Sequence, residues 1–431
     1  MLIYEYAYDR AKWEQYFADY SANDHATNTD VKHLRNYIDS EKYKEVLQNY
    51  ESSGNFPEPR LLVLNKKGTE KKRVVFSFDE DEAWLLKFFG FWLHTYDDIF
   101  SDNLYSFRKQ RSVKTAVARI LKQKKLSEMY GVKLDIHDYF NSADTDLILK
   151  KLQEILILPG TNYNCNSQSL TLEKSSDKQI KLYKLFENIL RNPYVHNEIK
   201  QGKKSELILN YERIISPVHK GMMAGSPLSP FLANLYLNDL DRHFDSLDGF
   251  YARYSDDIII FTESEEKLKE ELNFFMNSIK ENGLTLNPDK LSYINPGQSF
   301  EFLGFSFENG SVDVSKSSFE KIKKKLRRKA RAILRWRVKK DIEAEKAARV
   351  YIRYFNRKFF ENPVKSELTW CRWYFPIITT DVTLKEIDHY MQECIRYIFT
   401  GKHTKRNYNI RYETLKGLGY RSLVNEFHKN P

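Results

Sequence analysis

Short runs of β-branched and aromatic residues predict strands at intervals along the chain. They lie at 61–64, 74–78, 132–136, 251–261 and 300–305. Longer stretches carry apolar residues at helical spacing, which predicts amphipathic or buried helices. These stretches lie within 1–60 and at 82–100, 231–244, 265–282 and 319–337. The pattern therefore predicts a mixed fold of helices and hairpin-connected strands.

The run from Tyr251 to Phe261 is interpreted as two strands joined by a tight turn, with Asp256 and Asp257 at its tip. Adjacent carboxylates repel each other, so folding alone gives little reason to place them between apolar strands. A divalent cation would supply a reason, because hard oxygen ligands suit Mg²⁺. Taken by itself, however, an Asp-Asp pair is more often a solvated acidic turn, and the choice depends on the rest of the chain.

Positive charge is concentrated in one stretch of this 431-residue chain, whose formal net charge is +10. Residues 316–340 hold thirteen Lys or Arg and one acid, Glu320, which gives a local charge of +12 and leaves −2 (10 − 12) for the remainder. Such a stripe favours a polyanion as partner. Considered separately, it is as often the solvated face of a helix.

The composition is 41% hydrophobic and 30% charged. No apolar run approaches the roughly 18 residues of a membrane span. The N-terminal residues Met1–Tyr6 have neither the basic flank nor the apolar core of a signal peptide. Cys165, Cys371 and Cys394 lie far apart without metal-ligand spacing, which predicts a reducing cytoplasm and no structural zinc.

Four further segments carry candidate chemistry. The basic tip Lys66–Arg73 can grip a triphosphate, or it can be a solvated hairpin loop. The basic residues of 105–112 precede a helix whose first turn could hold a phosphate. Asp135 follows an apolar strand, from which its carboxylate could reach the Asp256–Asp257 turn. The small residues of 220–230 let a ligand approach the backbone closely.

Taken in order, these segments resemble the motifs of the reverse transcriptase family over about residues 60–307. Asp135, in an Asp-x-x-Asp-Tyr-Phe setting, resembles motif A, and the segment from Gly225 to Leu237 resembles motif B of group II intron-like enzymes. Tyr-Ser-Asp-Asp at 254–257 resembles motif C. The segments 283–290 and 302–305 are similar to motifs D and E.

The resemblance implies an α+β right-hand polymerase with fingers, an antiparallel palm sheet and a helical thumb. It divides the chain into a helical N-terminal extension (1–58), fingers and palm (59–310) and a basic helical thumb and C-terminal region (311–431). The stretch at about 155–210 is expected to be an inserted lobe within the second part.

The same resemblance implies two-metal nucleotidyl transfer. Asp135 and Asp256 would bridge two Mg²⁺ ions, with Mn²⁺ as a substitute, and Asp257 would be a weaker ligand or a charge partner. The Ile136 carbonyl is expected as a further ligand. Lys290 falls where a motif D lysine protonates the leaving pyrophosphate.

The incoming dNTP is expected to contact Lys66, Lys72, Arg73, Phe140, Ala224 and Gly225. Phe140 falls at the aromatic position that blocks a ribose 2′-hydroxyl, and Ala224 replaces the usual Gln before the motif B glycine, which predicts relaxed or unusual nucleotide selection. Nucleic-acid contacts are expected from Arg108, Arg111, Lys321, Lys324, Arg328, Arg331 and Arg335. For Lys66, Arg73, Phe140, Lys290 and Arg108, a salt bridge or a packing role remains an alternative.

The chain resembles most the bacterial "unknown group" reverse transcriptases of antiphage defence, with type 2 as one candidate class. This implies a dedicated structured noncoding RNA as template and scaffold, dNTPs as substrates, a cDNA product and a bacterial cytoplasmic location. Two alternatives stay open: an untemplated DNA-synthesising enzyme, as in abortive-infection relatives, and a non-catalytic RNA-binding scaffold. The sequence leaves the template, the primer, the trigger and the oligomeric state open.

Overall fold

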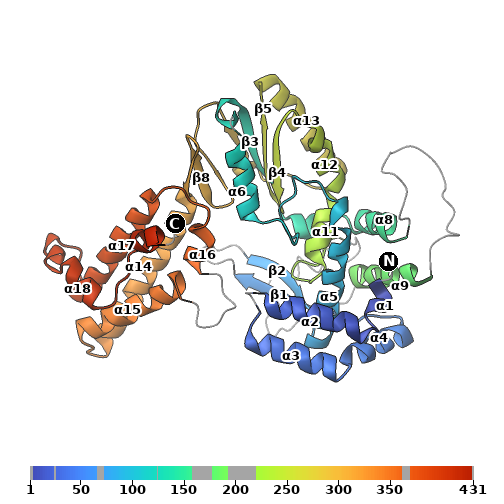
Figure 1. The fold of residues 1–431 in the computed structure, drawn as a ribbon, viewed down its shortest axis with the longest axis horizontal. Helices are drawn as coiled ribbons and strands as arrows, with labels where there is room; N and C mark the ends of the chain where they lie inside the picture. The colour runs from blue at the N-terminus through green and yellow to red at the C-terminus, as the bar shows by residue number, and fades with distance from the viewer. Residues whose placement is uncertain are drawn as a thin grey trace. The chain divides into compact units, whose positions relative to one another are not determined.

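The computed structural model describes residues 3–23, 26–65, 72–123, 125–157, 177–192, 220–361 and 369–429. The chain divides into two compact units, whose elements are drawn in Figure 1. The first unit holds Met1–Ala22, Thr29–Ala116 and Glu128–Asn295, and the second holds Asn23–Asn28, Val117–Ser127 and Pro296–Pro431. The C-terminal part of the second unit begins at Pro296, whereas the thumb and C-terminal region was expected to begin at residue 311, and that division into domains stays a prediction.

In the first unit, helices near the N-terminus pack around the ring of Trp13. These helices are α1 (Ile3–Tyr6), α2 (Arg10–Ala22), α3 (Asn28–Asp39), α4 (Lys42–Ser53) and α5 (Glu80–Leu93). The buried Trp13 ring stacks on Phe88 of α5, with 4.0 Å between ring centroids, and on Tyr43 of α4, at 4.8 Å. The N-terminal helices α2 and α4 therefore share a core with helix α5.

A two-stranded antiparallel hairpin follows, made of β1 (Arg60–Asn65) and β2 (Lys72–Ser77). Arg60 lies opposite Ser77 and Asn65 lies opposite Lys72, so the strands are paired along their whole length. The basic tip between them, including Lys66, lies outside the described residues, and so does the side chain of Lys72.

A four-stranded antiparallel sheet in the order β4-β5-β3-β6 forms the centre of the first unit. Its strands are β3 (Tyr130–Asp135), β4 (Gly249–Tyr254), β5 (Asp257–Thr262) and β6 (Ser292–Ile294). The apolar run 258–261 of β5 is fully buried, and helix α13 (Glu265–Glu281) packs on β3 and β5. Glycine suits position 131 because a Cβ there would overlap the ring of Phe261 on the paired strand.

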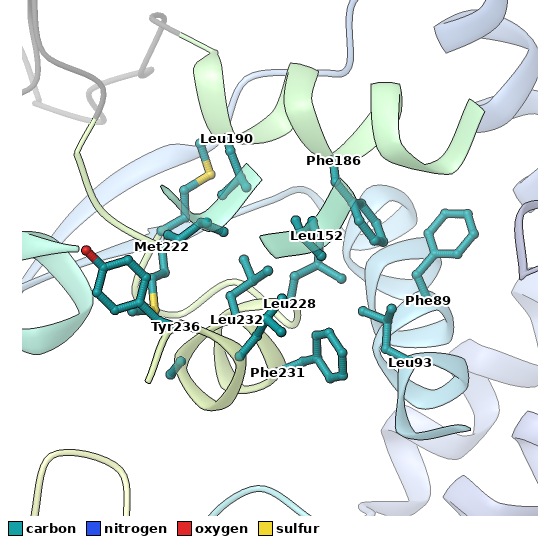
Figure 2. Packing of buried hydrophobic residues seen from close by; sticks show 14 of the residues in the cluster. Phe89, Leu93, Leu152, Phe186, Leu190, Met222, Leu228, Phe231, Leu232 and Tyr236 are labelled. Atoms are coloured by element: carbon teal, nitrogen blue, oxygen red, sulfur yellow. The ribbon is translucent and has the colours of Figure 1, made fainter. Parts of the chain in front are cut away.

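Helices from distant parts of the sequence enclose the core of this unit, as Figure 2 shows. Leu152 comes from α8 (Thr145–Leu156), Phe186 from α9 (Asp177–Arg191) and Phe231 from α11 (Ser229–Tyr236). Phe89 of α5 lies beside them. The only described part of the expected inserted lobe after residue 157 is 177–192, and its helix α9 belongs to this core.

Several shorter elements complete the first unit. The expected helix 231–244 is broken at Leu237, where ψ turns to +15°. The elements are the 3₁₀ segments η1 (His94–Ile99), η4 (Phe244–Ser246) and η5 (Pro288–Lys290) and the helices α7 (Tyr139–Ser142) and α12 (Asn238–His243). Helix α6 (Val113–Lys122) begins in the first unit and ends in the second. The segment η2 (Leu126–Glu128) begins in the second unit and ends in the first.

The second unit combines a small antiparallel sheet with a helical bundle. The sheet has the order β7-β8-β9, with strands Phe300–Phe302, Phe305–Glu308 and Ser311–Val314. The remaining elements are α14 (Lys316–Lys339), α15 (Ala344–Phe359), α16 (Trp370–Tyr374), α17 (Val382–Thr400), η6 (Lys405–Asn409), α18 (Tyr412–Gly417) and α19 (Leu423–Lys429). Helix α14 packs on α15 and α17. None of the helices in the described ranges is both long and apolar enough to cross a membrane.

Candidate active site

The pairing of β3 with β5 brings Asp135 and the Asp256–Asp257 turn together. Asp135, the last residue of β3, lies directly opposite Asp257, the first residue of β5. The N–H of Ile136 donates a hydrogen bond of 3.2 Å to the Asp256 carbonyl, which ties the two chain segments together beyond the strand ends. The register therefore places carboxylates from distant motifs side by side, as the sequence predicted.

Lys290 reaches the same place from η5. Its ammonium donates a hydrogen bond to Oδ1 of Asp135, a residue that is buried. The neighbouring Asn287 donates its backbone N–H to the Asp135 carbonyl at 2.8 Å and its side-chain Nδ2 to Asp135 Oδ2 at 3.4 Å. Partial burial acts to lower the pKa of Lys290, but its hydrogen bond with Asp135 raises it overall, so this lysine holds its proton firmly.

The carboxylates carry more negative charge than their surroundings neutralise. Burial raises the pKa of Asp257 to about 6, and the charges of Asp256 and Asp135 act in the same direction. Lys133 and Lys290 act against this rise without cancelling it. A carboxyl group with a raised pKa is one that would gain from a nearby cation.

The donor chemistry of this cluster fits a hard divalent ion, since it offers carboxylate oxygens beside backbone carbonyls. Among the residues that the structure describes, no three His, Cys, Asp or Glu side chains are already gathered as a ligand set. The cation found at Asp135 is instead the Lys290 ammonium. The residues therefore fit a metal in type, charge and register, while metal binding by Asp135, Ile136, Asp256 and Asp257 stays a prediction.

A loop at 221–225 joins the helix after Asp135 to the β1–β2 hairpin. The N–H of Met222 donates to the Phe140 carbonyl at 2.8 Å, and the N–H of Phe76 on β2 donates to the Ala224 carbonyl at 2.7 Å. Gly225 has φ +97°, and a Cβ there would lie 2.8 Å from the Phe76 carbonyl oxygen, so only glycine fits. The loop thus links Phe140, Ala224 and Gly225 with strand β2, which carries Arg73.

Comparison with known proteins gives these motifs a family. Residues 64–307, more than half of the chain, match the family described as reverse transcriptase (RNA-dependent DNA polymerase). The chain belongs to the reverse transcriptase family. Its α+β architecture, with an antiparallel central sheet and a helical C-terminal unit, confirms the predicted fold class and the predicted enzyme family.

Two curated relatives match parts of this reverse transcriptase. The retron Ec86 reverse transcriptase of Escherichia coli is 25% identical over 182 residues, which cover 37% of this chain and 57% of that protein. The enzymatic polyprotein of Cestrum yellow leaf curling virus is 35% identical over 91 residues, which cover 20% of this chain and 14% of the polyprotein. This chain therefore spans little more than half of the length of the retron enzyme that it matches.

Among solved structures, apo telomerase from Candida tropicalis matches with a TM-score of 0.44 and 14% identity, covering 88% of this chain and 64% of that chain. The same telomerase truncated from its C-terminal domain matches with a TM-score of 0.43 and 13% identity, covering 63% of this chain and 60% of that chain.

The expected nucleic-acid contacts of this reverse transcriptase fall into two groups. Arg108 donates hydrogen bonds to the carbonyls of Ser101 (2.7 Å) and Asp97 (2.9 Å), and burial lowers its pKa. Arg111 forms an ion pair with Asp102. Both arginines therefore hold their own loop together in this structure, and their contact with a template stays a prediction.

The second group lies on α14 of the other unit. Ile322, Leu326, Ala330 and Ile333 form the buried side of this helix. The exposed positions include all five predicted phosphate contacts, Lys321, Lys324, Arg328, Arg331 and Arg335. Their spacing of three and four residues places them along one stripe of the helix, here called the α14 stripe.

A buried ion pair behind the carboxylate turn was not predicted from the sequence. Arg253 of β4 donates Nε to Asp241 Oδ1 at 2.7 Å and Nη2 to Asp241 Oδ2, and both side chains are fully buried. The Tyr251 hydroxyl donates to the same carboxylate at 2.7 Å. Burial acts to lower the pKa of Arg253, but the charge of Asp241 raises it overall. The available signal was a lone arginine inside an otherwise apolar strand.

Proposed function

We propose that this protein is an RNA-directed DNA polymerase that copies a dedicated structured noncoding RNA into cDNA from dNTPs. The observation that carries the proposal is the register of the central sheet, in which Asp135 lies opposite Asp257 and beside the Asp256 turn. Membership of the reverse transcriptase family supports it. Because the chain spans 57% of the retron enzyme's length, the activity of the whole protein needs its own test.

In this proposal, Asp135 and Asp256 hold two Mg²⁺ ions, with Asp257 and the Ile136 carbonyl completing the ligand set. Bound there, the ions would stabilise the charge on the attacking and leaving oxygens of an in-line displacement. Mn²⁺ would replace Mg²⁺. Lys290, whose pKa is raised by its bond to Asp135 although partial burial opposes the rise, carries the proton that the leaving pyrophosphate needs.

Nucleotide selection is assigned to the residues joined by the 221–225 loop. The Phe140 ring would exclude a ribose 2′-hydroxyl, while Arg73, with Lys66 and Lys72, would contact the triphosphate. Ala224 leaves the usual Gln side chain out of this site, so discrimination between bases should be relaxed. Misincorporation by Ala224→Gln should be several-fold lower than in the wild type, because a site gains discrimination when a polar contact is added. Equal error rates would contradict this assignment.

The direct test supplies purified protein with dNTPs and Mg²⁺, with and without ribonuclease treatment, and sequences both the copurifying nucleic acid and the product. A product complementary to the copurifying RNA, lost after ribonuclease treatment, supports templated synthesis. A product unrelated to that RNA would favour an untemplated polymerase. Incorporation lost in Asp256→Asn but kept in Asp341→Asn, an exposed aspartate of the second unit, would assign the activity to this site.

The α14 stripe is proposed to bind phosphates of the structured RNA. Replacing Lys321, Lys324, Arg328, Arg331 and Arg335 by Gln should weaken RNA binding and flatten its dependence on salt, since each phosphate contact releases counterions. A matched variant would neutralise the same number of exposed cations on α15, namely Lys346, Arg349, Arg353, Arg357 and Lys358. Unchanged affinity and salt slope in the α14 variant would contradict the role of this stripe.

We further propose a role in antiphage defence in a bacterial cytoplasm, as a member of the "unknown group" enzymes. The retron relative from Escherichia coli is consistent with a bacterial source. Plaque counts on cells with the wild-type protein and with Asp256→Asn test both the role and the need for catalysis. Full protection by Asp256→Asn would instead favour a non-catalytic RNA-binding scaffold.

A further inference from the structure

The residue between Tyr254 and the two aspartates has an unusual backbone. Ser255 lies in the left-handed region, with φ +61°, and is buried. Residues other than glycine adopt this conformation only where the surroundings impose it, and such residues cluster at functional sites. Ser255 is the first central residue of the two-residue turn between the paired residues Tyr254 and Asp257, and such turns place this residue at positive φ. A serine there is less favourable than glycine, so hydrogen bonds to its peptide groups help to hold the turn.

Two side chains bind the peptide groups of Ser255: Ser106 comes from a distant segment, and Arg253 comes from strand β4, which leads into the turn. Its N–H donates a hydrogen bond of 2.9 Å to Oγ of Ser106, and its carbonyl accepts one of 3.3 Å from Nη1 of Arg253. Ser106 and Arg253 are both 0% exposed, so water cannot replace either bond. The conformation of the turn is thus held by one side chain of its own hairpin and by one from a distant segment.

Ser106 is itself held by Asn234 of helix α11. The Ser106 hydroxyl donates to Asn234 Oδ1 at 3.2 Å, and Asn234 Nδ2 donates to the Ser106 carbonyl at 2.9 Å. Since its proton points to Asn234, the hydroxyl presents a lone pair to the Ser255 N–H. Asn234 is also 0% exposed. The hydrogen bonds between Ser106 and Asn234 therefore determine the direction from which the Ser106 oxygen accepts the N–H of Ser255.

The backbone before Ser106 is paired with the strand that leads into the turn. The N–H of Arg253 donates to the Asn103 carbonyl at 3.0 Å, and the N–H of Tyr105 donates to the Arg253 carbonyl at 2.9 Å. The segment 103–105 thus extends the sheet beyond β4 and fixes the position of Ser106 along it. Strand pairing therefore fixes the distance between Ser106 and the turn, and Ser106 can shift little along the strand.

We propose that Ser106, oriented by Asn234, is a positioning residue for the carboxylate turn, and that it sets the direction in which Asp256 and Asp257 present their oxygens to Mg²⁺. The proposal rests on the polymerase function proposed above. Mg²⁺ demands nearly ideal octahedral geometry, so a small rotation of the Ser255 peptide would weaken its binding. Mn²⁺ is larger and, as a high-spin d⁵ ion, has no ligand-field preference for one geometry, so it would tolerate the rotation better.

The experiment compares the wild type with Ser106→Ala and Ser106→Thr. For each we measure the melting temperature in EDTA, the rise in melting temperature with Mg²⁺ or Mn²⁺ without nucleotide, and kcat and KM for dNTP. Ser106→Ala should raise the Mg²⁺ concentration at half-effect by about tenfold, the size expected when a partner of metal ligands is lost. The kcat of Ser106→Ala should fall by a similar factor with an unchanged KM. With Mn²⁺ in place of Mg²⁺, both the rise in the metal concentration at half-effect and the fall in kcat should be smaller. Ser106→Thr should retain wild-type behaviour.

A matched control is Ser422→Ala in the second unit. Ser422 is also a buried serine, and its hydroxyl donates to Asp388 Oδ2 at 2.6 Å. Its loss should lower the melting temperature in EDTA without moving the Mg²⁺ midpoint. If Ser106→Ala behaves like this control, Ser106 is merely structural and the proposal is overturned.

Two further variants keep the test decisive. If Ser106→Ala does not fold, Asn234→Leu should give the same rise in the Mg²⁺ midpoint, because it removes the Oδ1 acceptor that orients the Ser106 hydroxyl. An unchanged midpoint would overturn the proposal. Adding Ser255→Gly to Ser106→Ala should recover part of the Mg²⁺ response, since glycine adopts positive φ freely. A double variant no better than Ser106→Ala would contradict the role assigned to the left-handed residue.

Failure of this inference can be told apart from failure of the proposed function. A wild-type protein that incorporates no dNTP with either metal would count against the polymerase, while the melting measurements would still report on the turn. An active wild type whose Mg²⁺ response is unaffected by Ser106→Ala would leave the polymerase standing and overturn the role of Ser106.

Discussion

The central sheet carries charge in two places, and the two are balanced differently. Behind the turn, Arg253 meets Asp241 in a two-point ion pair that is fully buried and completed by Tyr251. In front, the Lys290 ammonium pairs with Asp135, and the pKa of Asp257 stays raised to about 6 because of burial and the charge of Asp256.

The difference separates charge that supports the fold from charge kept for binding. A buried ion pair contributes to a stable core only when both partners and their hydrogen bonds are present. A carboxylate cluster with unbalanced charge makes the metal-free fold less stable, and it gains stability from any cation that binds it. Changes at the two places should therefore have opposite patterns of effect on activity and on stability.

The largest effect is expected from Asp256→Asn. Removing one negative charge from the proposed metal site should lower nucleotide incorporation by about 10³-fold or more, equivalent to several kcal/mol of transition-state stabilisation. The melting temperature in EDTA should not fall. Single-nucleotide extension measures the first quantity and thermal unfolding the second. An activity within tenfold of the wild type would contradict the assignment of the carboxylate cluster to metal binding.

The next effect is expected from Arg253→Met, which leaves Asp241 buried without its partner. Unfolding free energy should fall by about 3–5 kcal/mol, as is found when one partner of a buried pair is removed. Urea unfolding measures the loss. Adding Asp241→Leu should restore much of the stability, since two apolar groups can replace a buried ion pair. A loss below about 1 kcal/mol would show that the pair is not fully desolvated.

Asp257→Asn should stabilise the metal-free protein at pH 7. The folded pKa of Asp257 is about 6 and the ordinary value is 3.8, so this group favours the folded state below pH 3.8 and loses that contribution as the pH rises through 6. Removing the charge should add roughly 1–3 kcal/mol in EDTA. Unfolding at pH 7 and at pH 4 checks the sign, because the gain should largely vanish at pH 4.

The smallest effect is expected from Tyr251→Phe. This change removes one hydrogen bond to Asp241 and leaves the ion pair intact, so unfolding free energy should fall by about 1 kcal/mol. Incorporation of dNTP should stay within about twofold of the wild type. A fall in kcat much larger than the stability loss explains would show that the Arg253–Asp241 pair also serves the reaction. The distinction between this pair and the carboxylate cluster would then be wrong.

Much of the site could be predicted from local sequence. Tyr254 to Asp257 lies between two apolar strands, and such a run has few ways to fold other than a hairpin. The apolar run before Asp135 likewise predicts a strand that ends close to this residue. Lys290 was predicted only through resemblance to a motif, since nothing in a loop of Gly, Asn, Pro and Asp indicates a contact with Asp135.

The supporting residues could not be predicted from local sequence, for physical reasons. Ser106 and Asn234 are 128 residues apart, and both are of residue types that are usually solvated. Arg253 stands in a strand whose neighbours are apolar, but only the packing of α12 shows that Asp241 meets it. The β1–β2 hairpin was predicted as a pair of strands, whereas its attachment to Ala224 depends on backbone hydrogen bonds that any sequence could make.

By itself, the sequence determined which segments form strands, where the carboxylates stand and to which family the motifs belong, because these follow from periodicity and from residue types that chemistry requires. Tertiary structure alone decided that Ser255 is left-handed, that Ser106 and Arg253 bind its two peptide groups, and that Lys290 meets Asp135. Those facts depend on the register between strands distant in sequence, and register is fixed only when the whole sheet has assembled.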